Sequence, residues 1–271
     1  MRAAKLLVSR GATRVFLASR SGRVARDGQG LGAQLQELGT DARVVACDGG
    51  DFAESVALLC RCQPLTGMLH AAGVLSDKLL RSMAADNVGF VLEPKAMAAS
   101  HLHKANSRTV LEALGLFSSV SSTFGNVGQA SYAAANSYLD ALAFQRRSQG
   151  GVASSLQIPA VRGAGMGAST FDAAQLDAIG AVTLDEFAAC LLVSLAPGRA
   201  AAEGTQAPLV QALIDGLPRM PLIAEMVSKA RPVTAAEAAA PTSQSRLALA
   251  PRRRRRAVIG RDCGERMACG V

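Results

Sequence analysis

The sequence predicts a three-layer α/β fold, in which a doubly wound parallel sheet lies between two layers of helices. Strand-like apolar runs alternate with helix-like segments, as a parallel sheet with crossover helices requires. The 271 residues suffice for one such domain with a sizeable core. A buried strand over 116–119 also ends in serines and leads, through a glycine-containing loop, into a helix that opens near Tyr132. Ligands of open α/β sheets bind at such strand ends.

The expected elements follow one another with short connections, and glycines stop several of them. Strands are expected at 14–18, 43–47, 67–70, 116–119, 152–158 and 208–214. Helices are expected at 5–11, 32–38, 52–62, 79–84, 91–104, from Tyr132 onward and at 183–195. In the last of these helices, Asp185 and Glu186 stand in the first turn, where the helix dipole favours acidic side chains.

The spacing of polar residues after the strand over 116–119 predicts a site. Tyr132 and Asn136 are four residues apart, so they share one face of a helix. Ser119 ends the preceding strand, and the arrangement brings a serine hydroxyl, a phenol and an amide to one crevice. The alternative is structural: Tyr132 would be a half-buried helix tyrosine, and the serines a polar loop.

The amino-acid sequence of this segment resembles the active-site region of ketoreductase domains of type I polyketide synthases and animal-type fatty acid synthases. These domains belong to the short-chain dehydrogenase/reductase superfamily. The matching runs are Phe117-Ser118-Ser119, Gly128-Gln129, Tyr132-Ala133-Ala134-Ala135-Asn136 and Leu139-Asp140-Ala141-Leu142-Ala143. The resemblance implies a Rossmann-like sheet, reduction of a β-ketoacyl thioester with NADPH, and partnership with an acyl carrier protein and other synthase domains.

The same resemblance implies four catalytic residues. Ordinary short-chain dehydrogenases carry a lysine four residues after the tyrosine, whereas the synthase domains have asparagine there and take the lysine from the preceding helix. This chain has Asn136 at that position and Lys95 in the helix over 91–104. Ser119 and Tyr132 complete the set. A lysine on the surface of its helix is the structural alternative for Lys95.

Residues at the ends of the earlier strands resemble the family's cofactor site. Ser19-Arg20 corresponds to the Ser-Arg pair that holds the 2′-phosphate of NADPH, and Asp48 to an aspartate beside the adenine. Ala71, Ala72 and Gly73 resemble the segment along the ribose and nicotinamide. The structural alternatives are a surface arginine, a turn aspartate and, for the preceding His70, a core histidine.

The sequence also departs from the family pattern at several positions. The family's first strand and its Gly-rich phosphate turn precede the segment that begins at Lys5, so we expect a sheet that lacks both and has two unpaired edges. Ser76 and Phe124 replace residues that mark the two stereochemical classes, so the product's hand is not assigned. The segment 159–167 lacks the two tryptophans of the family, which weakens the expected lid over the substrate.

Composition suggests a boundary near residue 227. The reductase-like domain is expected over 1–227, followed by an Ala-, Pro- and Arg-rich, disordered tail over 228–271. From Met226 onward there are ten basic and three acidic residues, which accounts for most of the formal net charge of +8. The arginine run 252–256 could bind RNA, a membrane or an import receptor, but a solvated tail is the preferred interpretation.

The remaining composition predicts a cytoplasmic protein without metal, nucleic-acid or membrane partners. No apolar run reaches the length of a membrane span, and no secretory signal follows the basic start. The cysteines lack zinc-ligand spacing and are expected as reduced thiols. The leading hypothesis is a working ketoreductase. An inactive reductase-like fragment with a scaffold role or none is the alternative, and an arginine-tail nucleic-acid binder ranks last.

Overall fold

The computed structural model describes residues 2–23, 31–107, 109–163, 165 and 171–195. All strands pair in parallel: β1 (Arg14–Ser19), β2 (Asp41–Ala46), β3 (Gly67–His70), β4 (Ala113–Ser119) and β5 (Ser154–Ile158). The helices are α1 (Arg2–Ser9), α2 (Leu31–Gln36), α3 (Phe52–Arg61), α4 (Ala85–Leu92), α5 (Ala98–Ala105), α6 (Ser121–Phe124), α7 (Ala130–Ser148), α9 (Ala173–Ala178) and α10 (Leu184–Leu195). A 3-10 turn, η1 (Leu80–Ser82), and a π-helical turn, η2 (Glu93–Met97), flank α4.

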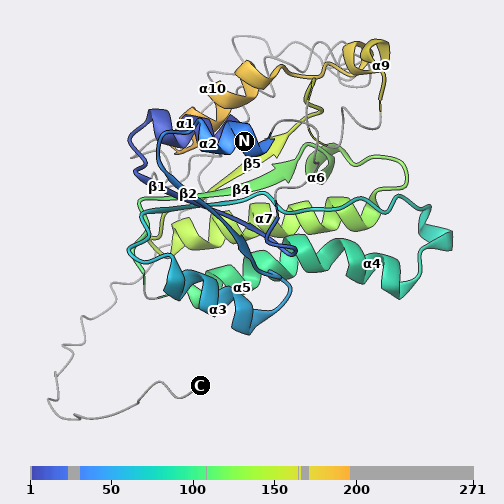
Figure 1. The fold of residues 1–271 in the computed structure, drawn as a ribbon. Coiled ribbons are helices and arrows are strands. Elements are labelled where there is room, and N and C mark those ends of the chain that lie inside the picture. Colours follow the sequence, from blue (N-terminus) through green and yellow to red (C-terminus); the bar gives the residue numbers. More distant parts are fainter. Residues whose placement is uncertain (1, 24–30, 108, 164, 166–170, 196–271) are drawn as a thin grey trace, which may run out of the picture. The chain divides into compact units, whose positions relative to one another are not determined.

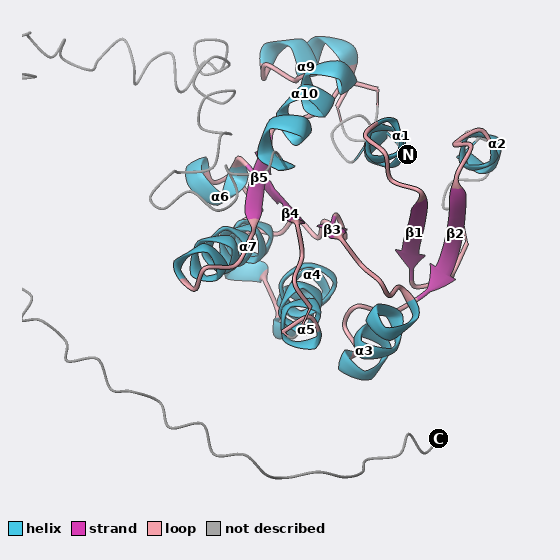
Figure 2. Cartoon of the chain, turned by 90° about the vertical axis from the view of Figure 1, so that its left-hand side faces the viewer, coloured by secondary structure: helices cyan, strands magenta, loops and turns pink. Residues whose placement is uncertain are grey.

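The strands form two separate sheets (Figure 2). One has the order β1-β2 and the other the order β3-β4-β5. Within the described part of the chain, no strand pairs with the second edge of β1 or of β3. A doubly wound sheet without its central strand divides in this way, so the division agrees with the expected fold class.

Helices cover both faces of the β3-β4-β5 sheet, which confirms the three-layer arrangement (Figure 1). On one face, α7 packs on β4 and β5 through a cluster that includes Leu114, Leu116, Leu139 and Leu142, all at most 3% exposed. On the other face, α10 packs on the same strands, with Leu191 fully buried. Burial of apolar side chains on both faces accounts for the near-continuous apolar sequence of β4.

The β1-β2 sheet has its own smaller core. Ala4 of α1, Val15 of β1 and Leu38 after α2 form a buried cluster. Leu6 of α1 packs instead against the cluster around Leu191. The first helix therefore contacts the cores of both sheets, although the two sheets share no backbone hydrogen bonds in the described residues.

The turn after β2 lies against α5. A Cβ on Gly49 would stand 2.8 Å from the Cβ of Ala98, so this approach requires glycine. The Nδ1 of His101 bonds with the carbonyl oxygen of Gly49 at 3.1 Å. Asp51 then caps α3 by accepting a hydrogen bond from the Glu54 amide.

Three local expectations need correction. The helix expected at 79–84 is only the short turn η1, and the helix expected at 91–104 begins earlier, at Ala85, and contains the π-helical turn η2. The loop after β4 includes a short helix, α6, that the sequence did not predict. The strand expected at 208–214, the domain boundary at residue 227 and the tail lie outside the described residues. No helix in the described ranges is long and apolar enough to cross a membrane.

Candidate active site

β4 delivers Ser119 to the carboxyl end of the sheet. Its Oγ accepts a hydrogen bond from the backbone amide of Ser121 at 3.2 Å, which fixes the side chain at the start of α6. Gly125 ends α6 with φ of 69°, a conformation that favours glycine. The neighbouring Ser118 is buried and donates to the carbonyl oxygen of Asn136 at 3.3 Å. This bond ties the strand tip to α7.

α7 presents Tyr132 and Asn136 on its buried face. Tyr132 is 8% exposed and Asn136 is fully buried. The Asn136 amide nitrogen donates to the carbonyl oxygen of Tyr132 at 2.8 Å, whereas its Oδ1 has no protein partner. A buried amide oxygen without a partner is costly. This oxygen is therefore available to a donor supplied by a ligand or a water molecule.

Lys95 joins this group from the π-helical turn η2. Its side chain is 3% exposed, which rules out the surface-lysine interpretation. The Nζ donates to the carbonyl oxygen of Phe117 in β4 at 2.8 Å and lies 5.5 Å from the centre of the Tyr132 ring. The structure thus brings Lys95, Ser119, Tyr132 and Asn136 together, from two helical segments and a strand end.

Burial shifts the pKa values of the two ionisable groups toward their neutral forms. Desolvation lowers the pKa of Lys95 to about 8, although the negative charge of Asp140 acts to raise it. Desolvation raises the pKa of Tyr132, while hydrogen bonds with Asn136 and Ser119 act to lower it. Near neutral pH, a protonated phenol therefore lies beside a lysine that keeps its positive charge.

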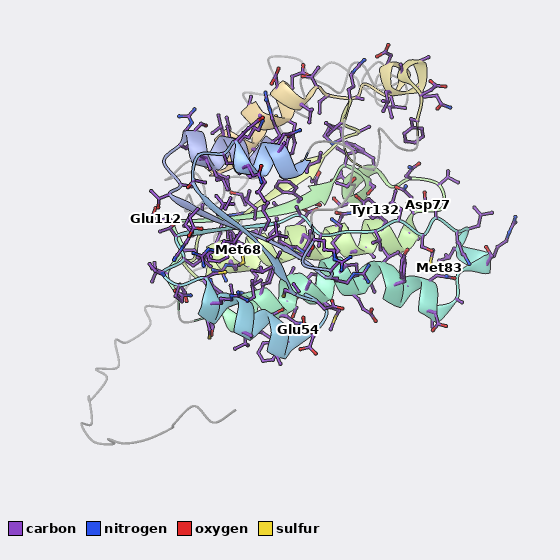
Figure 3. All side chains as sticks on the ribbon, viewed as in Figure 1. Glu54, Met68, Asp77, Met83, Glu112 and Tyr132 are labelled. Carbon is purple, nitrogen blue, oxygen red and sulfur yellow. The ribbon has the colours of Figure 1, made fainter. Side chains whose placement is uncertain are left out.

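The loop after β3 closes over the same end of the sheet. Asp77 accepts a hydrogen bond from the side chain of Gln129 at 2.9 Å, and the amide of Lys78 donates to the carbonyl oxygen of Gly128 at 2.8 Å. Figure 3 shows Tyr132 and Asp77 toward one end of the sheet and Glu112, which precedes β4, toward the other. The negative charge of Asp77 also contributes to raising the pKa of Tyr132.

The residues expected at the cofactor lie in two places. Arg20 is exposed in the turn after β1, and the Oγ of Ser19 donates to the carbonyl oxygen of Arg23 at 3.2 Å. Asp48 accepts a hydrogen bond from the amide of Gly50 at 2.9 Å. This local bond is the one expected if Asp48 is a turn aspartate.

The segment after β3 adjoins Lys95 directly. Ala71 and Ala72 are exposed, so their backbone is open to a ligand. A Cβ on Gly73 would stand 2.8 Å from the Cε and 3.3 Å from the Nζ of Lys95. The absence of a side chain at this position keeps the path of the lysine clear.

Two residues near the site were not assigned a role from the sequence. His70 is 5% exposed and bonds with the backbone carbonyl of Lys95. Asp140 accepts hydrogen bonds from Ser122 and Gln157 at 2.7 and 2.9 Å, which joins α6, α7 and β5. Both lie within matched family segments, but only the three-dimensional contacts reveal what they hold.

The fold and this arrangement define a Rossmann-like reductase of the short-chain dehydrogenase/reductase type. A family model for the KR domain matches residues 1–163, more than half of the chain. The chain therefore belongs to the ketoreductase domains of type I polyketide synthases.

Individual relatives agree with this assignment. Polyketide synthase GfsA of Streptomyces halstedii is 46% identical over 150 residues, which is 54% of this chain and 2% of that protein. The spectinabilin synthase protein NorB of Streptomyces orinoci is 41% identical over 181 residues, 65% of this chain and 8% of that protein. The chain thus spans only a small fraction of the curated relatives that it matches.

Solved ketoreductases share the fold. An A-type ketoreductase from a modular polyketide synthase has a TM-score of 0.64 at 35% identity, covering 70% of this chain and 42% of that one. The first ketoreductase of the tylosin polyketide synthase has a TM-score of 0.62 at 33% identity, with the same coverage.

Proposed function

We propose that this chain reduces the β-carbonyl of a β-ketoacyl thioester, carried on an acyl carrier protein, to a hydroxyl group, with NADPH as the cofactor. The observation that carries the proposal is the position of the Lys95 amine, 5.5 Å from the Tyr132 ring, in a group completed by Ser119 and Asn136. The carrier protein and the other synthase domains are inferred from the large synthases among its relatives.

The residues after the strands suit a nicotinamide cofactor. Arg20 supplies an exposed guanidinium for a 2′-phosphate, where an acidic residue would favour NAD. The segment from Ala71 to Gly73 offers exposed backbone and no side-chain bulk beside Lys95. Ser19 and Asp48 would lie toward the ribose and the adenine. Bound NADPH would supply the hydride.

The protein's own groups manage the charge and the proton. Ser119 and Tyr132 would donate hydrogen bonds to the β-carbonyl oxygen, where negative charge develops. Tyr132 would then pass its proton to that oxygen as a general acid. The phenolate left behind is costly because its pKa is raised by burial, and the Lys95 ammonium beside it would stabilise the anion. Asn136 would orient the phenol or a proton-relay water.

An inactive fragment remains the second candidate, because two observations favour it. The sheet is divided between β1 and β3, so the described residues show no strand beside the expected phosphate site. One relative, 40% identical over 144 residues, is a putative inactive polyketide synthase of Mycobacterium tuberculosis. Such a chain would keep the fold without binding the cofactor.

One experiment separates these candidates. NADPH fluorescence would be titrated with the purified chain, and turnover of a model β-ketoacyl thioester measured for the parent and Tyr132→Phe. We expect NADPH to bind both proteins alike, and the variant to lose about 10²- to 10⁴-fold in turnover. Tyr138→Phe is the matched control, since Tyr138 lies on α7 but is 38% exposed. Absence of NADPH binding would support the inactive fragment, and unchanged turnover of Tyr132→Phe would refute the role of the phenol.

A further inference from the structure

His70 is a buried titratable residue that the proposed reaction does not use. It ends β3, is 5% exposed and lies opposite Leu116 in the parallel register with β4. Its Nε2 is 2.9 Å from the backbone carbonyl oxygen of Lys95. A carbonyl oxygen can only accept, so Nε2 carries the proton and the imidazole donates. Burial lowers the pKa of His70 to about 4, which keeps the ring neutral near neutral pH.

The carbonyl that receives this bond belongs to an irregular helical turn. In η2, the amide of Ala98 bonds both to the carbonyl of Glu93, five residues back, and to the carbonyl of Lys95, and Pro94 has no amide hydrogen to donate. Single π-helical turns are rare and often lie at functional sites. The Lys95 carbonyl oxygen thus accepts from the Ala98 amide and, through its second lone pair, from His70, a donor outside the helix.

Lys95 is held both at its backbone and at its amine. His70 anchors its backbone carbonyl, and the carbonyl oxygen of Phe117 accepts from its Nζ at 2.8 Å. Between these points the side chain passes Gly73, where a Cβ would stand 2.8 Å from the lysine Cε. The φ of Gly73 is not positive, so an alanine fits the backbone and conflicts only with the lysine.

We propose that His70 and Gly73 are positioning residues for Lys95: the imidazole fixes the turn that carries the lysine, and the glycine leaves the space through which the amine reaches Tyr132. This inference rests on the proposed role of Lys95 in ketoreduction. It adds a function for His70, and it gives Gly73 a task besides contact with the cofactor.

The test reads the position of the amine without substrate or cofactor. Lys5, Lys78, Lys95, Lys104 and Lys229 are the only lysines of the sequence, so ¹⁵N-lysine labelling gives a simple spectrum, and Lys95→Arg assigns the signal. The Lys95 amine titrates at a pKa of about 8 because it is buried. Its other ionisable neighbours are His70, Tyr132 and Asp140. An amine released toward solvent should titrate closer to its ordinary value.

Two variants of His70 separate the effect of its hydrogen-bond donor from the effect of its side-chain packing. In His70→Leu, which has no donor, we expect the Lys95 pKa to rise by about one unit or more. In His70→Gln, whose side-chain amide can donate to the same carbonyl, we expect the parent value to return. A folded His70→Leu chain whose Lys95 titrates as in the parent would overturn the proposal for His70. Loss of thermal stability alone would indicate a merely structural histidine.

Gly73→Ala tests the other half of the proposal, and it can be measured even if His70→Leu does not fold. We expect the same upward shift of the Lys95 pKa, because the added methyl group displaces the lysine. Gly67→Ala is the control: it adds a methyl group at the start of β3, the strand that precedes Gly73, 3.5 Å from its nearest neighbour, the carbonyl oxygen of Ala113. Equal titrations of Lys95 in Gly73→Ala and Gly67→Ala would overturn the proposal.

Turnover then links the position to the reaction. We expect His70→Leu to lower kcat about tenfold or more with little change in KM, because His70 is buried and acts on Lys95 and not on the thioester. The NMR shift without any turnover in the parent chain would leave the positioning intact and refute the proposed function. A normal kcat in a variant whose amine has moved would show that reduction does not depend on the position of Lys95.

Discussion

The two sheets present their functional residues in contrasting ways. At the end of β4, Lys95, Tyr132 and Asn136 are buried, the Lys95 amine donates to Phe117 of β4, and the Asn136 amide donates to the Tyr132 carbonyl within α7. At the ends of β1 and β2, Arg20 and Asp48 are exposed on a two-stranded sheet that is not hydrogen-bonded to the other. The residues proposed for proton transfer are therefore held together by the described elements themselves. The residues expected at the cofactor are exposed or half-buried, and Ser19 and Asp48 bond within their own turns.

The largest expected effect tests the buried side of this comparison. Lys95→Met keeps an apolar chain of similar length but removes the charge that would stabilise the Tyr132 phenolate. We expect turnover of the model thioester to fall about 10²- to 10³-fold, with NADPH affinity changed much less. A variant within tenfold of the parent would show that the amine, although close to the phenol, takes no part.

The same substitution should raise stability. Below pH 8 the folded chain buries a charged lysine whose pKa is lowered from 10.5 to about 8, so folding works against a desolvation cost. Lys95→Met removes that cost but also the bond to Phe117, and we expect unfolding to become harder by roughly 1–3 kcal/mol. Denaturant unfolding at neutral pH measures this value. Above pH 10.5 the lysine is neutral in both states, so the gain should disappear there, and a gain that persists would argue against its origin in desolvation.

A smaller effect is expected on the exposed side. Arg20→Ala removes one guanidinium from the expected 2′-phosphate site, a charge-assisted contact worth about 1–2 kcal/mol. We expect the Kd for NADPH to rise about tenfold and that for NADH to change little. Arg23→Ala, on a neighbouring exposed arginine of the same turn, is the control. Equal losses for both cofactors would place Arg20 outside the phosphate site.

The sequence predicted the parts of this structure that repeat a regular pattern. Alternating strands and helices, the shared face of Tyr132 and Asn136, and the division of the sheet all follow from spacing or from family resemblance. The π-helical turn at Lys95 did not, because a single widened turn leaves the apolar periodicity around it almost unchanged. The role proposed for His70 was also missed, since a histidine ending a strand looks the same whether it fills the core or donates to a helix.

The central claim is that charged Lys95 stabilises the Tyr132 phenolate during reduction. The pH dependence of turnover tests this claim most directly, because it is measured during the reaction itself. The lysine must be charged to stabilise the phenolate, and it loses its proton with a pKa of about 8. We predict that kcat for the parent chain falls as the pH rises through 8, and that this fall is absent from the residual activity of Lys95→Met. A parent kcat that stays constant as the pH passes 8 would contradict the account.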